Sequence, residues 1–300
     1  MIRLDAATVL LQWAVGGLAF LWFTTRRREV GLGYGWLLRG TYLLIAAGGV
    51  ACGLAFGVQP VREIAGGGVV VVSAVVLGLS ILWKAAGVAG ATAEHDRRTA
   101  RVAAMTGIDR AARDGDGEED ATTRRGGREF PPVLDLVAPL IGVVGLVAAG
   151  IDAGLDVTDG STFDVVVALL RTLAGAAFLG AVTDAMLLGH WYLVQPGLPR
   201  RHINELVHAL GVVWPVEVGA LLLPTGMFSV WVGSVDDGWS GTLGWFWGAC
   251  AATTLILVFV TRAALRERSY SAVMAATGLL YLAILTAFGT DLVARAVLAG

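Results

Sequence analysis

The sequence predicts an all-α, polytopic membrane protein with about eight transmembrane helices, both termini outside and one long disordered cytoplasmic loop. Hydrophobic residues make up 56% of the 300 residues and charged residues only 15%, whereas about a quarter of an average globular chain is charged. Mean hydropathy is +0.71. The apolar residues form continuous runs of about 18 to 25, long enough for helices to cross roughly 30 Å of hydrocarbon. These features exclude a soluble enzyme, a nucleic-acid-binding domain and an outer-membrane barrel of alternating ten-residue strands.

Eight apolar runs define the expected spans, at residues 6–24, 41–58, 67–88, 133–152, 164–193, 203–224, 241–262 and 270–294. All but four of the 22 lysines and arginines fall near alternate ends of these spans, the exceptions being Arg3, Arg62, Arg171 and Arg295. Because Lys and Arg concentrate on the cytoplasmic side of a membrane, both termini are expected outside. Frequent Ala, Gly, Val and Arg are compatible with a GC-rich bacterial genome, so a bacterial plasma membrane is expected.

The long polar stretch 91–131 divides the chain. Its second part is rich in charge and poor in apolar residues, which predicts a disordered cytoplasmic loop that could bind a partner protein. On either side we expect a three-span part at 1–90 and a five-span part at 132–300, with lipid as the main surroundings. Residues 225–240 could hold a short interfacial helix, since Trp231 and Trp239 suit the headgroup region. Cys52 and Cys250 stand alone and predict neither a disulfide nor a metal site.

Most ionisable residues within apolar runs lie in 164–224, and such residues usually face the protein interior. Arg171 lies about seven residues below the outer surface, roughly 10 Å at 1.5 Å per residue, and Glu217 has a similar depth on the next span. We therefore expect an Arg171–Glu217 ion pair. It could fix the register of two helices, or it could be a gate or substrate-binding charge, because a buried pair alone indicates little beyond specificity.

Histidines cluster at the cytoplasmic ends of the fifth and sixth spans. His190 and His208 have similar depths on neighbouring helices and are candidate cofactor ligands, since two histidines can hold a haem iron. His202, Glu205 and His208 are spaced three apart, and a Glu-x-x-His spacing places two metal ligands on one helix. Asp184, deeper in the membrane, is a candidate relay carboxylate together with Arg171 and Glu217. The alternatives are that these histidines have a hydrogen-bonding or proton-handling role, or that they are ordinary interfacial residues.

Two further features concern packing in the same region. Ala177, Ala181, Ala185 and Gly189 recur every four residues, and such a stripe lets another helix approach closely. Pro215 removes a backbone donor from the sixth span. At the far end of the eighth span, Asp291 and Arg295 are four residues apart and are expected to pair.

Three classes of function remain open from the sequence. The first is a redox-associated membrane subunit that binds quinone, haem or metal near the cytoplasmic ends of the fifth and sixth spans. The second is a proton-coupled or small-solute transporter that uses Arg171, Asp184 and Glu217. The third is a scaffold or assembly factor without chemistry of its own. The local histidine cluster favours the first class, and neither substrate nor oligomeric state follows from the sequence.

Overall fold

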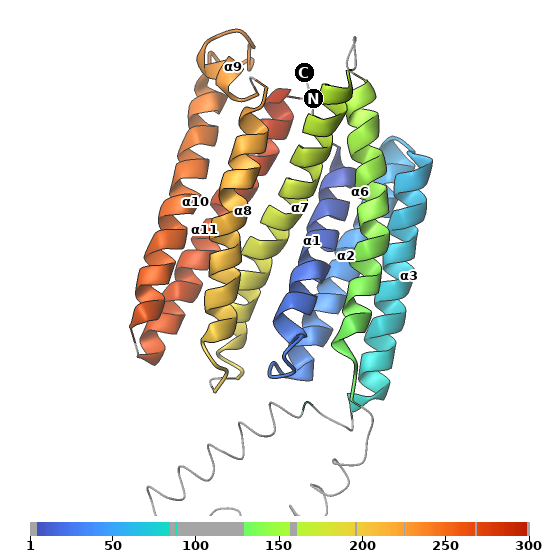
Figure 1. Cartoon of the computed structure of the whole chain (residues 1–300), viewed down its shortest axis with the longest axis vertical. Helices are drawn as coiled ribbons and strands as arrows, with labels where there is room; N and C mark the ends of the chain where they lie inside the picture. Colours follow the sequence, from blue (N-terminus) through green and yellow to red (C-terminus); the bar gives the residue numbers. More distant parts are fainter. Residues whose placement is uncertain are drawn as a thin grey trace, which may run out of the picture.

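The computed structural model describes residues 5–84, 88, 129–156, 161–195, 197–224, 226–267 and 269–298. These residues form helices and connections without any strand. Eight helices are long and apolar enough to cross a membrane, which confirms the expected fold class (Figure 1). They are α1 (Ala6–Thr25), α2 (Leu32–Phe56), α3 (Pro60–Leu82), α6 (Val137–Leu155), α7 (Thr162–Trp191), α8 (Arg201–Leu222), α10 (Thr242–Arg266) and α11 (Tyr270–Leu298). A 3-10 turn, η2 (Pro132–Leu136), precedes α6.

Two helices begin earlier than the apolar runs indicated. α2 starts at Leu32 rather than near 41, and α3 starts at Pro60 rather than near 67. The added turns carry Arg39 and Arg62, which hydropathy places outside a span. Both arginines are buried and bonded to carboxylates, so their charge is compensated inside the bundle.

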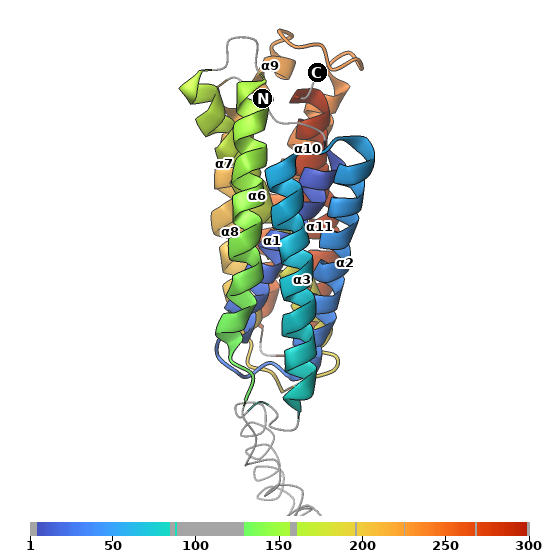
Figure 2. The same cartoon turned by 90° about the vertical axis from the view of Figure 1, so that its right-hand side faces the viewer.

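The helices pack in two groups of four that meet at α7. α1, α2, α3 and α6 surround one another, and so do α7, α8, α10 and α11, while α1 and α6 both pack against α7. Figure 2 shows α3 and α6 side by side on the outside of the first group. The polar stretch in the sequence separates three spans from five, whereas packing associates the fourth span, α6, with the first three.

α1 and α7 are the most buried of the eight helices. Gly16 of α1 lies against the backbone of α7 at Ala176, and Gly180 of α7 lies against the backbone of Gly16. A β-carbon at either glycine would collide with main-chain atoms of the other helix. This contact therefore depends on glycine at both positions.

The first turn of α1 and the last turn of α11 lie at the same end of the bundle (Figure 1). The short helix α9 (Phe228–Trp231) lies at that end too, which confirms the helix expected within 225–240. Which side of the membrane this end faces stays a prediction from the arginine distribution, and it is called the outer end below. Most of the expected disordered loop, residues 91–128, lies outside the described residues.

Candidate functional site

α7 positions three of the residues that the sequence singles out. Its start is fixed by a capping box, in which the Ser161 hydroxyl accepts from the Asp164 backbone N–H and the Asp164 carboxylate accepts from that of Ser161. From there the helix runs 30 residues without a break. It carries Arg171 near the outer end and Asp184 toward the opposite end, about 20 Å apart at 1.5 Å per residue.

Four charged side chains gather near the outer end of the bundle, buried between helices α7, α8 and α11. Glu217, Asp291 and Arg295 are fully buried, and Arg171 is 3% exposed. Arg295 donates to both carboxylate oxygens of Asp291 over 2.7 and 3.0 Å, which confirms the expected pair. Arg171, Asp291 and Arg295 all lie close enough to Glu217 to interact with it electrostatically.

The expected Arg171–Glu217 ion pair does not form. Arg171 instead donates to two backbone carbonyls at the end of α8, those of Ala220, at 3.0 Å, and Leu223. The last carbonyls of a helix lack partners within it, so they attract the guanidinium. Both carboxylate oxygens of Glu217 are left buried without a hydrogen bond.

A side chain that sequence reasoning missed, Gln12 of α1, completes the outer cluster. Its amide donates to the Thr172 carbonyl over 2.5 Å, and its carbonyl oxygen is buried without a partner. A β-carbon built on Gly175 would lie 2.9 Å from Asp291, 3.0 Å from Gln12 and 3.2 Å from Arg295. Side chains from α1 and α11 thus converge where α7 has no side chain. In the sequence, the one signal of this close approach is Gly175, a glycine within an expected helix.

Asp184 forms a second buried site in the other half of the bundle. It is fully buried, and one carboxylate oxygen accepts a short hydrogen bond from the hydroxyl of Tyr42 on α2. The other oxygen has no hydrogen-bond partner. Next to it in the chain, Thr183 accepts a hydrogen bond of 3.0 Å from the indole of Trp13 on α1. The sequence identified the carboxylate but not Tyr42, which lies about 140 residues away.

The two candidate cofactor histidines are exposed and face different surroundings. His190, on α7, lies beside Tyr281 of α11, with 3.4 Å between its Nδ1 and the tyrosine hydroxyl. His208 is exposed on α8. No hydrogen bond or ring contact joins the two histidines. A shared ligand of His190 and His208 stays a prediction.

Two of the three predicted metal ligands on α8, His202 and Glu205, pair with other side chains, and the third, His208, is exposed. His202 is buried with its Nε2 2.7 Å from the Glu29 carboxylate, which also pairs with Arg201. Glu205 pairs with Arg26 at 3.2 Å and Arg27 at 2.6 Å. Within the described ranges, no three His, Cys, Asp or Glu side chains are grouped so as to hold a metal ion. His202, Glu205 and His208 are thus not assembled as one ligand set.

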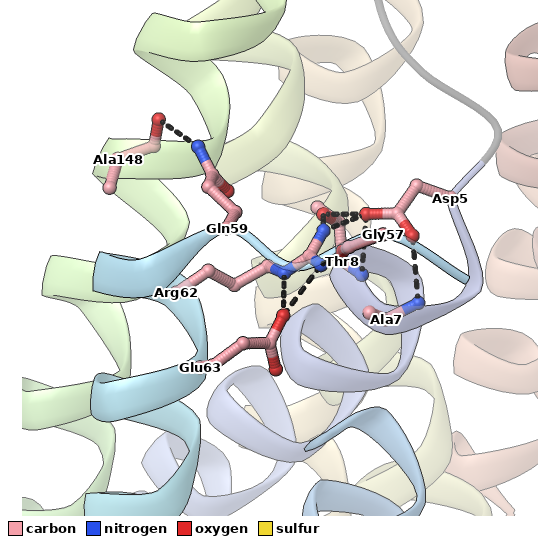
Figure 3. A network of polar contacts seen from close by, with 8 residues as sticks. All are labelled: Asp5, Ala7, Thr8, Gly57, Gln59, Arg62, Glu63 and Ala148. Atoms are coloured by element: carbon pink, nitrogen blue, oxygen red, sulfur yellow. Dashed lines mark hydrogen bonds and ion pairs between the residues drawn. The ribbon is translucent and has the colours of Figure 1, made fainter. Parts of the chain in front are cut away.

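A polar network at the outer surface was also missed (Figure 3). Arg62 of α3 donates to the carboxylates of Asp5 and Glu63, to the Thr8 hydroxyl at 3.1 Å and to the Gly57 carbonyl at 2.8 Å. The sequence places Arg62 in the connection between the second and third expected spans, because it lies between two apolar runs. Only the fold shows that its side chain links α3 to the start of α1.

The opposite end contains a buried pair of the same kind. Arg39 of α2 donates to both carboxylate oxygens of Asp135 in η2, over 2.7 and 2.8 Å, and both residues are 3% exposed. The Phe130 ring lies under the Arg39 guanidinium, with 4.6 Å between the ring centre and the guanidinium carbon. The ionisable residues thus form separate groups distributed from one end of the bundle to the other.

Comparisons with protein-family models, with curated proteins and with solved structures find no match for this chain. What the chain itself establishes is a multi-pass, all-helical integral membrane protein with buried carboxyl groups near both ends of its central helix.

Proposed function

We propose that this protein is a proton-coupled transporter of a small solute, and that Glu217 and Asp184 are the carboxyl groups that bind the proton. The observation that carries the proposal is Glu217. It is fully buried, and neither of its carboxylate oxygens has a hydrogen-bond partner. Asp291, Arg295 and Arg171 lie close enough to act on it electrostatically.

Such a carboxyl group can exchange a proton because neither of its two forms is fully stabilised. A buried carboxylate without hydrogen bonds is costly, which favours the neutral acid. The guanidinium groups of Arg171 and Arg295 favour the charged form, although Arg171 bonds to backbone carbonyls and Arg295 bonds to Asp291. Carboxyl groups of this kind within a membrane mark ion and proton pathways.

Asp184 supports the same proposal from the other half of the bundle. Tyr42 satisfies one of its oxygens and leaves the other open to a proton. Between Asp184 and Arg171 lies the contact of Gly16 with Gly180, where two backbones touch and leave no room for water. The two proposed proton sites therefore lie on either side of a close helix contact.

The redox alternative has less support, because no contact among the described residues links the two candidate haem ligands. His190 faces Tyr281 and His208 is exposed on another helix. A reduced-minus-oxidised visible spectrum of the purified protein separates the two functions, since a sharp α-band would favour the redox subunit. For the proton-coupled transporter we expect a flat spectrum.

The direct test measures proton entry into vesicles that contain the purified protein and a pH-sensitive dye. Potassium and valinomycin set a negative potential inside, which draws protons inward without added solute. We expect wild-type vesicles to acidify, and Glu217→Gln and Asp184→Asn to slow acidification at least ten-fold. Asp236→Asn is the matched control, because Asp236 is an exposed carboxylate at the outer surface. Wild-type vesicles that acidify no faster than protein-free vesicles would overturn the proposal that Glu217 and Asp184 carry protons in the absence of solute.

A further inference from the structure

We propose that protons reach the buried cluster from the outer side through a water-holding passage, and that Arg62 closes it. The inference rests on the proposed proton transport, because it assigns the entry route to Glu217. It begins at a hollow of about 630 Å³ at the outer end of the bundle, named here the vestibule. Asp5, Gln59, Arg62 and Asp152 supply its polar lining.

A second, much smaller cavity lies behind the vestibule. Its volume of about 10 Å³ is close to the minimum that holds one water molecule. Asp5, Gln59 and Arg62 line both spaces, and Thr172 and Arg295 line only the inner one. A water there has polar partners on several sides, which is the condition for a buried site to be hydrated. We call this space the inner cavity.

Arg62 lines both spaces and so stands at their boundary. It is 5% exposed and its guanidinium bonds to α1 through Asp5 and Thr8, and to α3 through Glu63. Five N–H groups form the full donor capacity of an arginine, and here both terminal nitrogens and Nε are engaged. The side chain is thus held across the passage by two carboxylates from different helices.

The inner cavity reaches the buried cluster at Arg295. Arg295 lines the cavity and bonds to Asp291, and Asp291 interacts electrostatically with Glu217. Gln12, whose amide bonds to the Thr172 carbonyl, lies with Asp291 and Arg295 around Gly175. A proton entering from the vestibule would pass to the cavity water and then to a carboxylate oxygen, so only O–H bonds form and break.

The structure therefore represents a state in which this route is closed. Opening requires that Arg62 release Asp5 and Thr8, which separates α1 from α3 at the outer surface.

The test measures the access of a reagent to Thr172 and uses no proton gradient. Thr172→Cys is made in a chain that also carries Cys52→Ala and Cys250→Ala, because these are the two native cysteines. Vesicles with the outer end exposed receive the small cationic thiol reagent 2-aminoethyl methanethiosulfonate. We expect slow labelling with Arg62 present and at least ten-fold faster labelling in Arg62→Ala. Asp5→Asn, which preserves the size of the side chain, should give an intermediate rate.

Thr277→Cys is the matched control, since Thr277 is a buried threonine on α11 that lines neither space. It should stay unlabelled in every background, and a single monomodal peak in size-exclusion chromatography checks that each variant folds. Thr172→Cys that stays unlabelled in both Arg62→Ala and Asp5→Asn would overturn the passage. Fast labelling with Arg62 intact would overturn its closing role. Labelling as expected in a protein that moves no protons would overturn the proposed function and leave the passage as a water inlet.

Discussion

Gly16 of α1 and Gly180 of α7 meet backbone to backbone at the centre of the bundle. The two helices are 164 positions apart in the chain at this point, and their contact joins the two groups of four helices. Because no flexible side chain separates them, neither backbone can yield locally to an added atom.

Gly180→Ala should therefore destabilise the protein, by about 1–3 kcal/mol as expected for overpacking. The free energy of unfolding in a mixed-detergent titration measures the effect. Gly219→Ala in α8 is the control, because nothing lies within 4 Å of a β-carbon at that position. Equal stabilities of the two variants would show that the helices can separate at little cost.

Arg39 and Asp135 should contribute strongly to stability when only one of them is removed. Arg39→Ala leaves a buried carboxylate without its partner, which typically costs about 3–5 kcal/mol. The double change Arg39→Met with Asp135→Leu should recover most of the loss, because no charge then stays buried. Arg28→Ala, which breaks the largely exposed Arg28–Glu129 pair, should cost less than about 1 kcal/mol. The same titration measures all three, and a double variant no better than the single one would refute this account.

Tyr42→Phe should affect Asp184 directly. The variant removes the hydroxyl that donates to the carboxylate and changes little else in volume. We expect a loss of about 1.5–3 kcal/mol, the range for a hydrogen bond to a charged group, and slower proton entry in the vesicle assay. Tyr281→Phe should change stability by less than about 0.5 kcal/mol, since Tyr281 is 45% exposed and its hydroxyl contacts only the exposed His190. The prediction fails if the two phenylalanine variants behave alike.

The loop before α10 should lose order in acid. Partial desolvation alone would raise the pKa of Asp237, but backbone N–H groups of Gly241, Trp239 and Leu243 bond to its carboxylate and lower the pKa below the usual value. A lowered pKa means that the stabilisation is present above the unfolded-state pKa and is lost as pH falls through the folded-state pKa.

Amide hydrogen exchange of Gly241 and Leu243 measures this loss locally. Protection should be constant near neutral pH, relative to the intrinsic exchange rate, and should decrease as the solution becomes more acidic than the usual aspartate pKa of about 3.9. Asp237→Asn should show weaker protection with no such acid transition. A wild-type protein whose protection is unchanged through that range would contradict the assignment.

The sequence was informative about depth and about the pair Asp291–Arg295 on one helix, but uninformative about partners on different helices. It identified Arg171, Asp184 and Glu217 as charges within apolar runs, and all three are buried. It paired Arg171 with Glu217 by depth alone, yet Arg171 bonds to the carbonyls that end α8. Equal depth leaves the rotation of each helix about its axis undetermined, and that rotation decides which side chains meet.

The histidines show the same limit. A spacing of three residues in His202, Glu205 and His208 places the side chains on neighbouring parts of one helix, but a ligand set also needs a common facing direction and free side chains. Glu29, Arg26 and Arg27, from the connection after α1, engage two of the three. Such contacts between distant segments have no local signature in a single sequence.

Hydrophobicity and the distribution of arginine were sufficient to predict the fold class, the number of spans and an expected orientation. Each of these depends on the transfer of a segment between water and lipid, and hence on its composition. The central position of α1, the two groups of four helices and the networks around Arg62, Gln12 and Tyr42 depended on the tertiary structure. In lipid, helices associate through close packing and hydrogen bonds rather than through hydrophobicity. Glycines such as Gly16 and Gly180, which the average hydropathy ignores, therefore decide which helices meet.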